Sequence, residues 1–174
     1  MRLFVAVSAP EEVLALVEAL PRPNLATLRW TTPDQWHVTL RFLGEVERSE
    51  PVVKALRQVP AALREAGVSE LEAVLGPAVA WFSGRRILQV PVAGIEQLAA
   101  HVWSASAKWG APPEPGPFTG HLTLARVRGQ DKGPASLAGT PIRASWRVEK
   151  FELMASTLGS GGAHYDVLEA VPLS

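Results

Sequence analysis

The chain of 174 residues is 47% hydrophobic and has a formal net charge of zero, so it is long and apolar enough to bury a core as one domain or as two small lobes. A zero net charge excludes a global electrostatic attraction for nucleic acid, so any contact with RNA must come from local arginines in a cleft. The chain has no cysteine, which excludes disulfides and thiolate-bound metals; with no signal peptide or long apolar run either, we expect a cytoplasmic location and no membrane partner.

The beginning of the chain predicts a strand, a helix and a second, short strand. Residues 2–8 are apolar on both alternating faces, which is typical of a central buried strand. Pro10 and the two glutamates after it favour a helix N-terminus, and apolar residues at helical spacing continue up to Pro21. A short strand at residues 28–31 and a turn then lead into residues 36–43.

Further along, residues 49–66 predict a helix that Pro60 should kink or split. The remaining expected elements are strands at 71–75, 78–82 and 86–92, a helix at 95–108, a proline-rich rigid loop at 111–117, a long strand at 142–156, a glycine-rich turn at 158–162 and a closing strand at 164–173. Strand, helix and strand therefore recur in the second half in the order they have in the first.

Residues 36–43 alternate as a half-buried strand does. The even-numbered residues from 36 to 42 are all apolar and are expected to face a core. The odd-numbered His37, Thr39 and Arg41 are then expected to share the outward face. An imidazole, a hydroxyl and a guanidinium would thus lie on one surface.

A second His-x-Thr-Leu tetrad begins at His121. It starts 121 − 37 = 84 residues after the first, close to half of the chain, as an internal duplication of one supersecondary unit would leave it. By the same alternation His121 and Thr123 face outward, and the leucines after them face inward. Two duplicated strands lying side by side would bring two imidazoles and two hydroxyls into one cleft.

Such a cleft suits phosphodiester chemistry. Two imidazoles near their ordinary pKa can hold one neutral and one protonated form at the same time near pH 7, so that one accepts a proton while the other gives one. Cleavage of a 2′,3′-cyclic phosphate needs both steps, with hydroxyls and a guanidinium holding the non-bridging oxygens. This chemistry requires no metal.

At these residues the chain resembles the 2H phosphoesterases, a family named for two His-x-Thr/Ser-x motifs in a duplicated fold. More narrowly, it resembles the bacterial and archaeal RNA 2′,3′-cyclic phosphodiesterases, also called 2′-5′ RNA ligases. The resemblance covers nearly the whole chain, through residues 2–7, 37–46, 117–126 and 156–165. It implies an α+β fold, a single domain over residues 1–174 made of two pseudo-symmetric lobes, with mostly antiparallel sheets flanked by helices around a central cleft.

The resemblance also implies the reaction and the roles of residues. The reaction is hydrolysis of RNA 2′,3′-cyclic phosphate ends to 2′-phosphomonoesters without metal or cofactor. The implied roles are proton donation by His37, proton acceptance by His121, and phosphate binding by Thr39, Thr123 and Arg126. Strict alternation places Arg126 on the face opposite His121, so it can reach the phosphate only if the strand bulges or ends between Leu124 and Arg126.

Three further residues are candidates for substrate binding. Arg41 shares the expected outward face of the first motif, and the aromatic rings of Phe118 and Tyr165 could stack on a nucleobase. The expected partners are RNA or nucleotides with 2′,3′-cyclic phosphate ends, and we expect a monomer.

Several alternatives stay open at the level of sequence. The two histidines could be structural strand residues, or a two-His metal site, although no carboxylate or third histidine lies on the same faces. The same cleft could instead join a cyclic end to a 5′-hydroxyl in a 2′-5′ linkage without ATP. A non-catalytic module that binds RNA ends is a further alternative, but such a module would be better served by lysine or arginine, which stay charged. Which histidine reaches the leaving oxygen is also open.

Overall fold

A single curled sheet organises the fold, and the computed structural model describes all 174 residues. Its ten strands follow the order β10-β9-β1-β3-β7-β6-β4-β8, with β2 paired to β7 and β5 paired to β6. The strands are β1 (Arg2–Val7), β2 (Leu28–Trp30), β3 (Val38–Glu45), β4 (Glu72–Leu75), β5 (Ala80–Trp81), β6 (Ile87–Ala93), β7 (His121–Val127), β8 (Ala144–Arg147), β9 (Lys150–Gly159) and β10 (Gly162–Pro172). All the paired strands are antiparallel.

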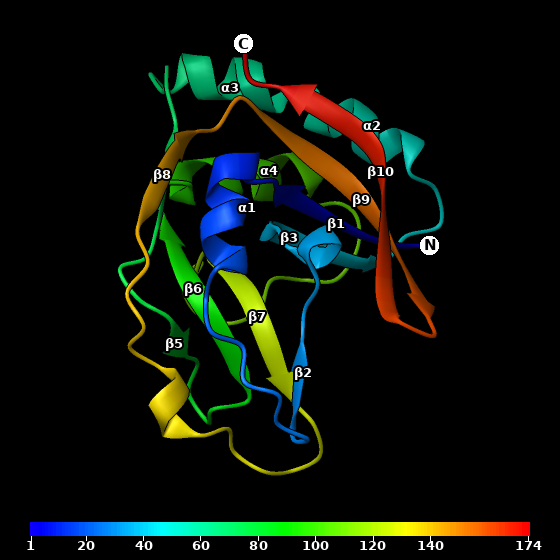
Figure 1. The fold of residues 1–174 in the computed structure, drawn as a ribbon. Helices are drawn as coiled ribbons and strands as arrows, with labels where there is room; N and C mark the ends of the chain where they lie inside the picture. The colour runs from blue at the N-terminus through cyan, green and yellow to red at the C-terminus, as the bar shows by residue number, and fades with distance from the viewer.

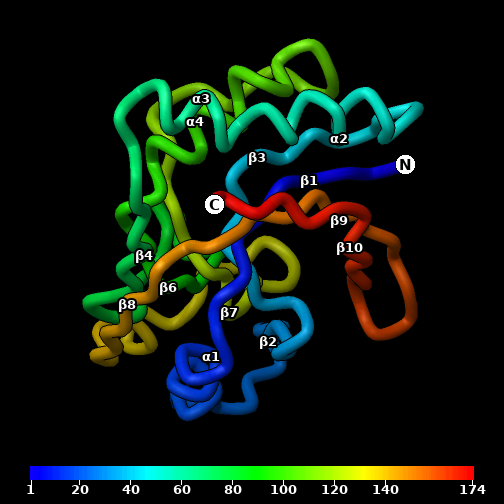
Figure 2. The backbone as a smooth tube through the Cα atoms, turned by 90° about the horizontal axis from the view of Figure 1, so that it is seen from above, coloured from blue at the N-terminus to red at the C-terminus, as the bar shows by residue number.

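Helices cover the sheet on two sides. The helices are α1 (Glu11–Glu18), α2 (Glu50–Leu56), α3 (Val59–Glu65) and α4 (Glu96–Ser106), and two short 3-10 helices are η1 (Pro33–Gln35) and η2 (Ala135–Leu137). Seen from above, α2, α3 and α4 lie together on one side of β1 and β3, and α1 lies on the other (Figure 2). The predicted α+β fold with mostly antiparallel strands is confirmed, and Figure 1 shows β3 and β7 in its middle. The division into two pseudo-symmetric lobes stays a prediction.

The helix predicted over residues 49–66 is split, as Pro60 led us to expect. The break falls between Leu56, the last residue of α2, and Val59, the first of α3. Leu56 is the residue four positions before Pro60, and the proline ring would clash with its carbonyl in a continuous helix. Pro60 instead occupies the first turn of α3, where its missing N–H costs no hydrogen bond.

The single long strand predicted over residues 142–156 is wrong. The chain forms β8 and β9 there, because β8 pairs with β4 at one end of the sheet and β9 pairs with β1 toward the other. Next, β9 and β10 form a hairpin with Gly159 opposite Gly162. The predicted turn at residues 158–162 is therefore tighter than expected, and the strands on both sides reach further.

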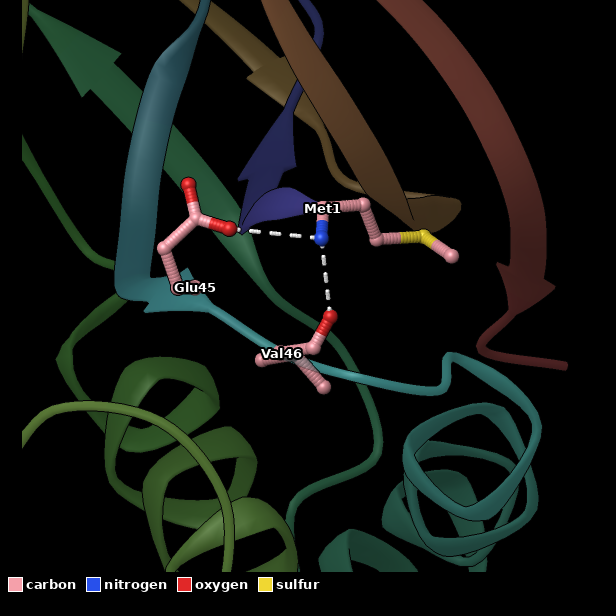
Figure 3. Close-up of polar contacts among 3 residues, drawn as sticks. All are labelled: Met1, Glu45 and Val46. Atoms are coloured by element: carbon pink, nitrogen blue, oxygen red, sulfur yellow. Dashed lines mark hydrogen bonds and ion pairs between the residues drawn. The ribbon is translucent and has the colours of Figure 1, made fainter.

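The N-terminus is fastened to the end of β3. The ammonium group of Met1 donates to the carbonyl oxygen of Val46 at 3.0 Å and lies 3.3 Å from a carboxylate oxygen of Glu45 (Figure 3). These contacts hold the start of β1 against β3, on which the first motif lies. The longest helix, α4, has 11 residues, and none of the helices has the length and apolar character needed to span a bilayer.

Candidate active site

The two His-x-Thr motifs lie side by side in the middle of the sheet. Val38 of β3 is opposite Leu122 of β7 in an antiparallel pair, and both side chains are fully buried. Continuing this register by one residue in each direction places the histidine of each motif opposite the threonine of the other. The other face therefore brings together four half-buried polar side chains: His37, Thr39, His121 and Thr123.

Each imidazole is held by a backbone carbonyl two residues before it. Nδ1 of His37 lies 2.8 Å from the carbonyl oxygen of Gln35, and Nδ1 of His121 lies 2.9 Å from that of Thr119. Because a carbonyl oxygen can only accept, Nδ1 carries the proton in the neutral ring and Nε2 keeps its lone pair. Nε2 of His37 also lies 2.9 Å from Oγ1 of Thr39. Both rings thus present Nε2 as the atom that can gain or lose a proton.

The environment lowers the pKa of both imidazoles. Burial is the main cause, and it lowers the pKa of His37 to about 4, while the hydrogen bond to Gln35 opposes the shift. The positive charges of His121 and Arg126 lower the pKa of His37 further, and Arg126 also lowers the pKa of His121. Both imidazoles are therefore neutral at pH 7 in the free protein, and Arg126 is close enough to act on both.

Strand β7 contains the bulge that Arg126 requires in order to lie on the same face as the histidines. Consecutive residues of β6 pair with Ala125 and Thr123, so Leu124 is an extra, unpaired residue. The β6 partners of Thr123 and Arg126 are two residues apart and hence on one face of β6. The bulge at Leu124 therefore brings Arg126 onto the face of the histidines, where strict alternation would not have placed it.

Strand β3 has a bulge at the equivalent position. Consecutive residues of β1 pair with Thr39 and Arg41, so Leu40 is the extra residue. The bulge turns Arg41 into the interior, where it is only 4% exposed. The expectation that Arg41 shares the histidine face and can bind substrate is therefore wrong. Phe42, which we expected in the core, is instead 47% exposed, at the place that Arg126 occupies on β7.

Arg41 holds the chain that follows α4. Its Nη1 donates to the carbonyl and the hydroxyl of Ser106, and its Nη2 donates to the carbonyls of Trp109 at 2.6 Å and Ala111 at 3.1 Å. The segment from Ala111 onward leads directly to His121. The first motif thus contributes a buried cation that positions the loop in front of the second.

An aromatic ring packs against each histidine. The ring centroid of Phe4 is 4.8 Å from that of His37, and the centroid of Phe82 is 4.7 Å from that of His121. Tyr165, a predicted candidate, packs edge-on against His37 at 5.1 Å. Phe4 and Phe82 were not among the residues predicted from the sequence, because they belong to segments that only strand pairing brings beside the motifs.

Two further side chains complete the surroundings of the site. Gln89 lies opposite Thr123, is 5% exposed, and its carbonyl oxygen Oε1 has no hydrogen-bond partner. A buried acceptor without a partner is a place where a ligand or a water can donate, and no sequence signal pointed to it. Phe118, the other aromatic candidate, is half-buried and packs against the main core.

Comparison with known proteins agrees with this geometry. The family described as LigT like phosphoesterase matches residues 3–79 and 88–165, which include both motifs. The chain belongs to the LigT-like phosphoesterases. The resemblance to 2H phosphoesterases that the sequence suggested is thereby confirmed.

Individual proteins also match this chain over most of their length. The RNA 2′,3′-cyclic phosphodiesterase of Escherichia coli K12 is 31% identical, over 97% of this chain and 94% of that protein. The crystal structure of TT0787 of Thermus thermophilus superposes with a TM-score of 0.76 at 32% identity, over 99% of this chain and 98% of that one. E. coli LigT in complex with 3′-AMP superposes with a TM-score of 0.72 at 26% identity, over 99% of this chain and 98% of that one.

Proposed function

We propose that this LigT-like phosphoesterase is a metal-independent RNA 2′,3′-cyclic phosphodiesterase that opens cyclic ends to 2′-phosphomonoesters. The observation that carries the proposal is the pair of imidazoles, one directly before β3 and one at the start of the adjacent β7. Each has Nδ1 held by a backbone carbonyl and Nε2 left as the reactive atom. The E. coli relative is named for this activity, and E. coli LigT has been crystallised with 3′-AMP. We infer the same class of substrate here.

The reaction divides the proton transfers between the two rings. Nε2 of His121 removes a proton from water, whose oxygen forms a bond to phosphorus. The bond from phosphorus to O3′ breaks, and the protonated Nε2 of His37 gives its proton to O3′. The products are a 2′-phosphate and a 3′-hydroxyl. This assignment of acid and base follows the family resemblance. The antiparallel pairing of β3 and β7 supports only the division of the two proton transfers between two neighbouring rings.

The negative charge of the substrate favours the protonated form of His37 that the reaction needs. His37 must be protonated to act, yet its pKa is about 4 in the free protein. The negative phosphate favours the protonated form of both rings and so raises their pKa when substrate binds. The hydroxyls of Thr39 and Thr123 and the guanidinium of Arg126 hold the non-bridging oxygens in this proposal. Proton loading and substrate binding are thus linked.

The nucleoside would lie beside the first histidine. Tyr165 and Phe4 pack against each other at 5.0 Å between ring centroids and against His37, so they offer an aromatic surface to the terminal base or ribose. A contact with Phe118 stays a prediction, as do the monomeric state and the cytoplasmic location.

The donor set supports the proposal that no metal takes part. Nowhere in the structure do three His, Asp or Glu side chains gather as potential metal ligands, and two imidazoles alone leave a divalent site incomplete. The proposed acid–base pair also generates its own nucleophile.

A short RNA that ends in a 2′,3′-cyclic phosphate tests the proposal. In excess chelator the protein should convert it to the 2′-phosphate, and His37→Ala or His121→Ala should each lower kcat by roughly a thousandfold. His101→Ala is the matched control, because this histidine lies on α4 and bonds only to the carbonyl of Gln97. Full activity in either motif variant, or a need for added metal, would refute the mechanism. Tight binding of the RNA without turnover would favour the binding-module alternative.

A further inference from the structure

A second arginine lies directly across from Arg126. In the antiparallel pair of β2 and β7, Arg29 is opposite Arg126, between the pairs formed by their neighbours. Leu28, which precedes Arg29, is buried on the other side of the strand. Arg29 therefore shares the face of Arg126, which is the face of the histidines.

This pair of arginines has no counter-charge in the protein. Like charges directly opposite each other on paired strands destabilise a sheet, and none of the six ion pairs of the structure includes Arg29 or Arg126. Both side chains are exposed. In a chain whose net charge is zero, two free guanidinium groups on one face beside the site are a local anion-binding feature.

The backbone around Arg29 leaves room for its guanidinium. Gly162, at the start of β10, has a φ of +102°, and a Cβ atom there would collide with Nη2 of Arg29. The side-chain amide of Gln35 donates to the carbonyl of Ala163 at 2.8 Å, while the backbone carbonyl of Gln35 holds Nδ1 of His37. One short segment thus links the hairpin tip beside Arg29 to the catalytic ring.

We propose that Arg29 binds a second phosphate of the substrate, the one on the 5′ side of the terminal nucleoside. This inference rests on the proposed function. An RNA with a cyclic end has its next phosphate only on that side. Arg126 is next to the cyclic phosphate, and Arg29 follows one strand further, roughly 5 Å away between Cα atoms, a step that successive phosphates of one strand can span. The protein would then select oligonucleotide ends or 5′-phosphorylated nucleotides over nucleosides with a cyclic phosphate alone.

Two substrates that differ by one group test the inference. They are adenosine 2′,3′-cyclic phosphate and the same compound with an added 5′-phosphate. The wild type should have the higher kcat/KM for the 5′-phosphorylated compound, and Arg29→Gln should lower this preference about tenfold, the usual cost of a lost charge-assisted hydrogen bond. Arg29→Lys should restore part of the preference, because it keeps the charge without the fork of donors. Arg143→Gln, an exposed arginine next to the edge strand β8, is the control and should keep the wild-type preference.

Two results would overturn the inference. One is an unchanged kcat/KM for both compounds in Arg29→Gln, and the other is an equal loss of kcat/KM on both compounds, which would place Arg29 at the cyclic phosphate or in the fold. If the wild type cleaved neither compound, the proposed function would fall, but direct binding would still decide the role of Arg29. Adenosine 2′,5′-bisphosphate should then bind the wild type more tightly than adenosine 2′-phosphate. In Arg29→Gln, the slope of log affinity against log salt concentration for the bisphosphate should decrease by about one phosphate contact. Equal binding of the two compounds to the wild type would contradict the inference.

Discussion

Replacing Arg41 by methionine tests whether this arginine supports the fold or the substrate. The change keeps a similar volume but removes the donors to three backbone carbonyls and one hydroxyl. The hydroxyl of Ser106 keeps its bond to the carbonyl of Val102 at 2.6 Å, and the carbonyls of Trp109 and Ala111 are near enough to the surface to bind water. The carbonyl of Ser106 stays buried, since this residue is 0% exposed, but it still accepts from the backbone N–H of Trp109 at 3.1 Å.

Losing one of the two hydrogen bonds to this carbonyl costs about 1 kcal/mol, and the contact of the guanidinium with the ring of Trp103, 4.1 Å from its centroid, adds about 1 kcal/mol. Loss of the other hydrogen bonds is partly offset, because the variant no longer has to bury a cation that lacks a carboxylate partner. We therefore expect Arg41→Met to lower the free energy of unfolding by about 2 kcal/mol.

Urea unfolding followed by tryptophan fluorescence measures this change. Arg57→Met is the matched control: it breaks an exposed ion pair with Glu169 and should cost less than about 1 kcal/mol. The folded Arg41 variant should also keep its KM, because the side chain points away from the cleft. An unfolding free energy within about 1 kcal/mol of the wild type, combined with a raised KM, would refute the reasoning and indicate that Arg41 binds the substrate.

The remaining predictions concern the motif residues. Because burial lowers the pKa of both histidines in the free protein, His37 to about 4, the pH optimum of kcat/KM should lie below 6.5, while that of kcat should lie higher, since bound phosphate raises both pKa values; identical profiles centred above pH 7 would contradict this. The unfolded chain has an ordinary histidine pKa near 6.5, so the stability that neutral His37 contributes is present above that pH and is lost as the pH falls toward 4, by about 3 kcal/mol in all. Urea midpoints at several pH values, compared with those of His37→Asn, measure this loss. Equal slopes of urea midpoint against pH in the two proteins would count against it. Thr39→Val and Thr123→Val should each lower kcat/KM about tenfold with the fold intact, and losses as large as those of the histidine variants would mean that the hydroxyls do more than hold phosphate.

The two β-bulges explain which parts of the site could be predicted. The histidines and threonines come before the extra residues Leu40 and Leu124, so simple alternation assigns them to the correct face. Beyond each bulge the side chains lie on the face opposite to the one that simple alternation assigns. Alternation alone therefore placed Arg41 on the outward face, whereas the bulge turns it inward. A bulge is set by pairing with a distant strand rather than by local residue type, so only Arg126, through its conflict with alternation, pointed to one.

Local chemistry and distant pairing also separate the successes from the errors in the fold. Pro60 splits its helix through a clash within one turn, which the sequence alone indicates. The break between β8 and β9 depends on partners at different places in the sheet, and nothing in residues 142–156 signals it. Phe82 and Gln89 were missed for the same reason, since strand pairing alone brings them beside the second motif.

A crystal structure of the protein with the product nucleotide adenosine 2′-phosphate would test the central claim most directly. The account predicts that Nε2 of His37 and Nε2 of His121 both lie within hydrogen-bond distance of the same phosphate group, with Arg126 on its non-bridging oxygens. A phosphate bound by only one ring, or bound away from β3 and β7, would contradict it.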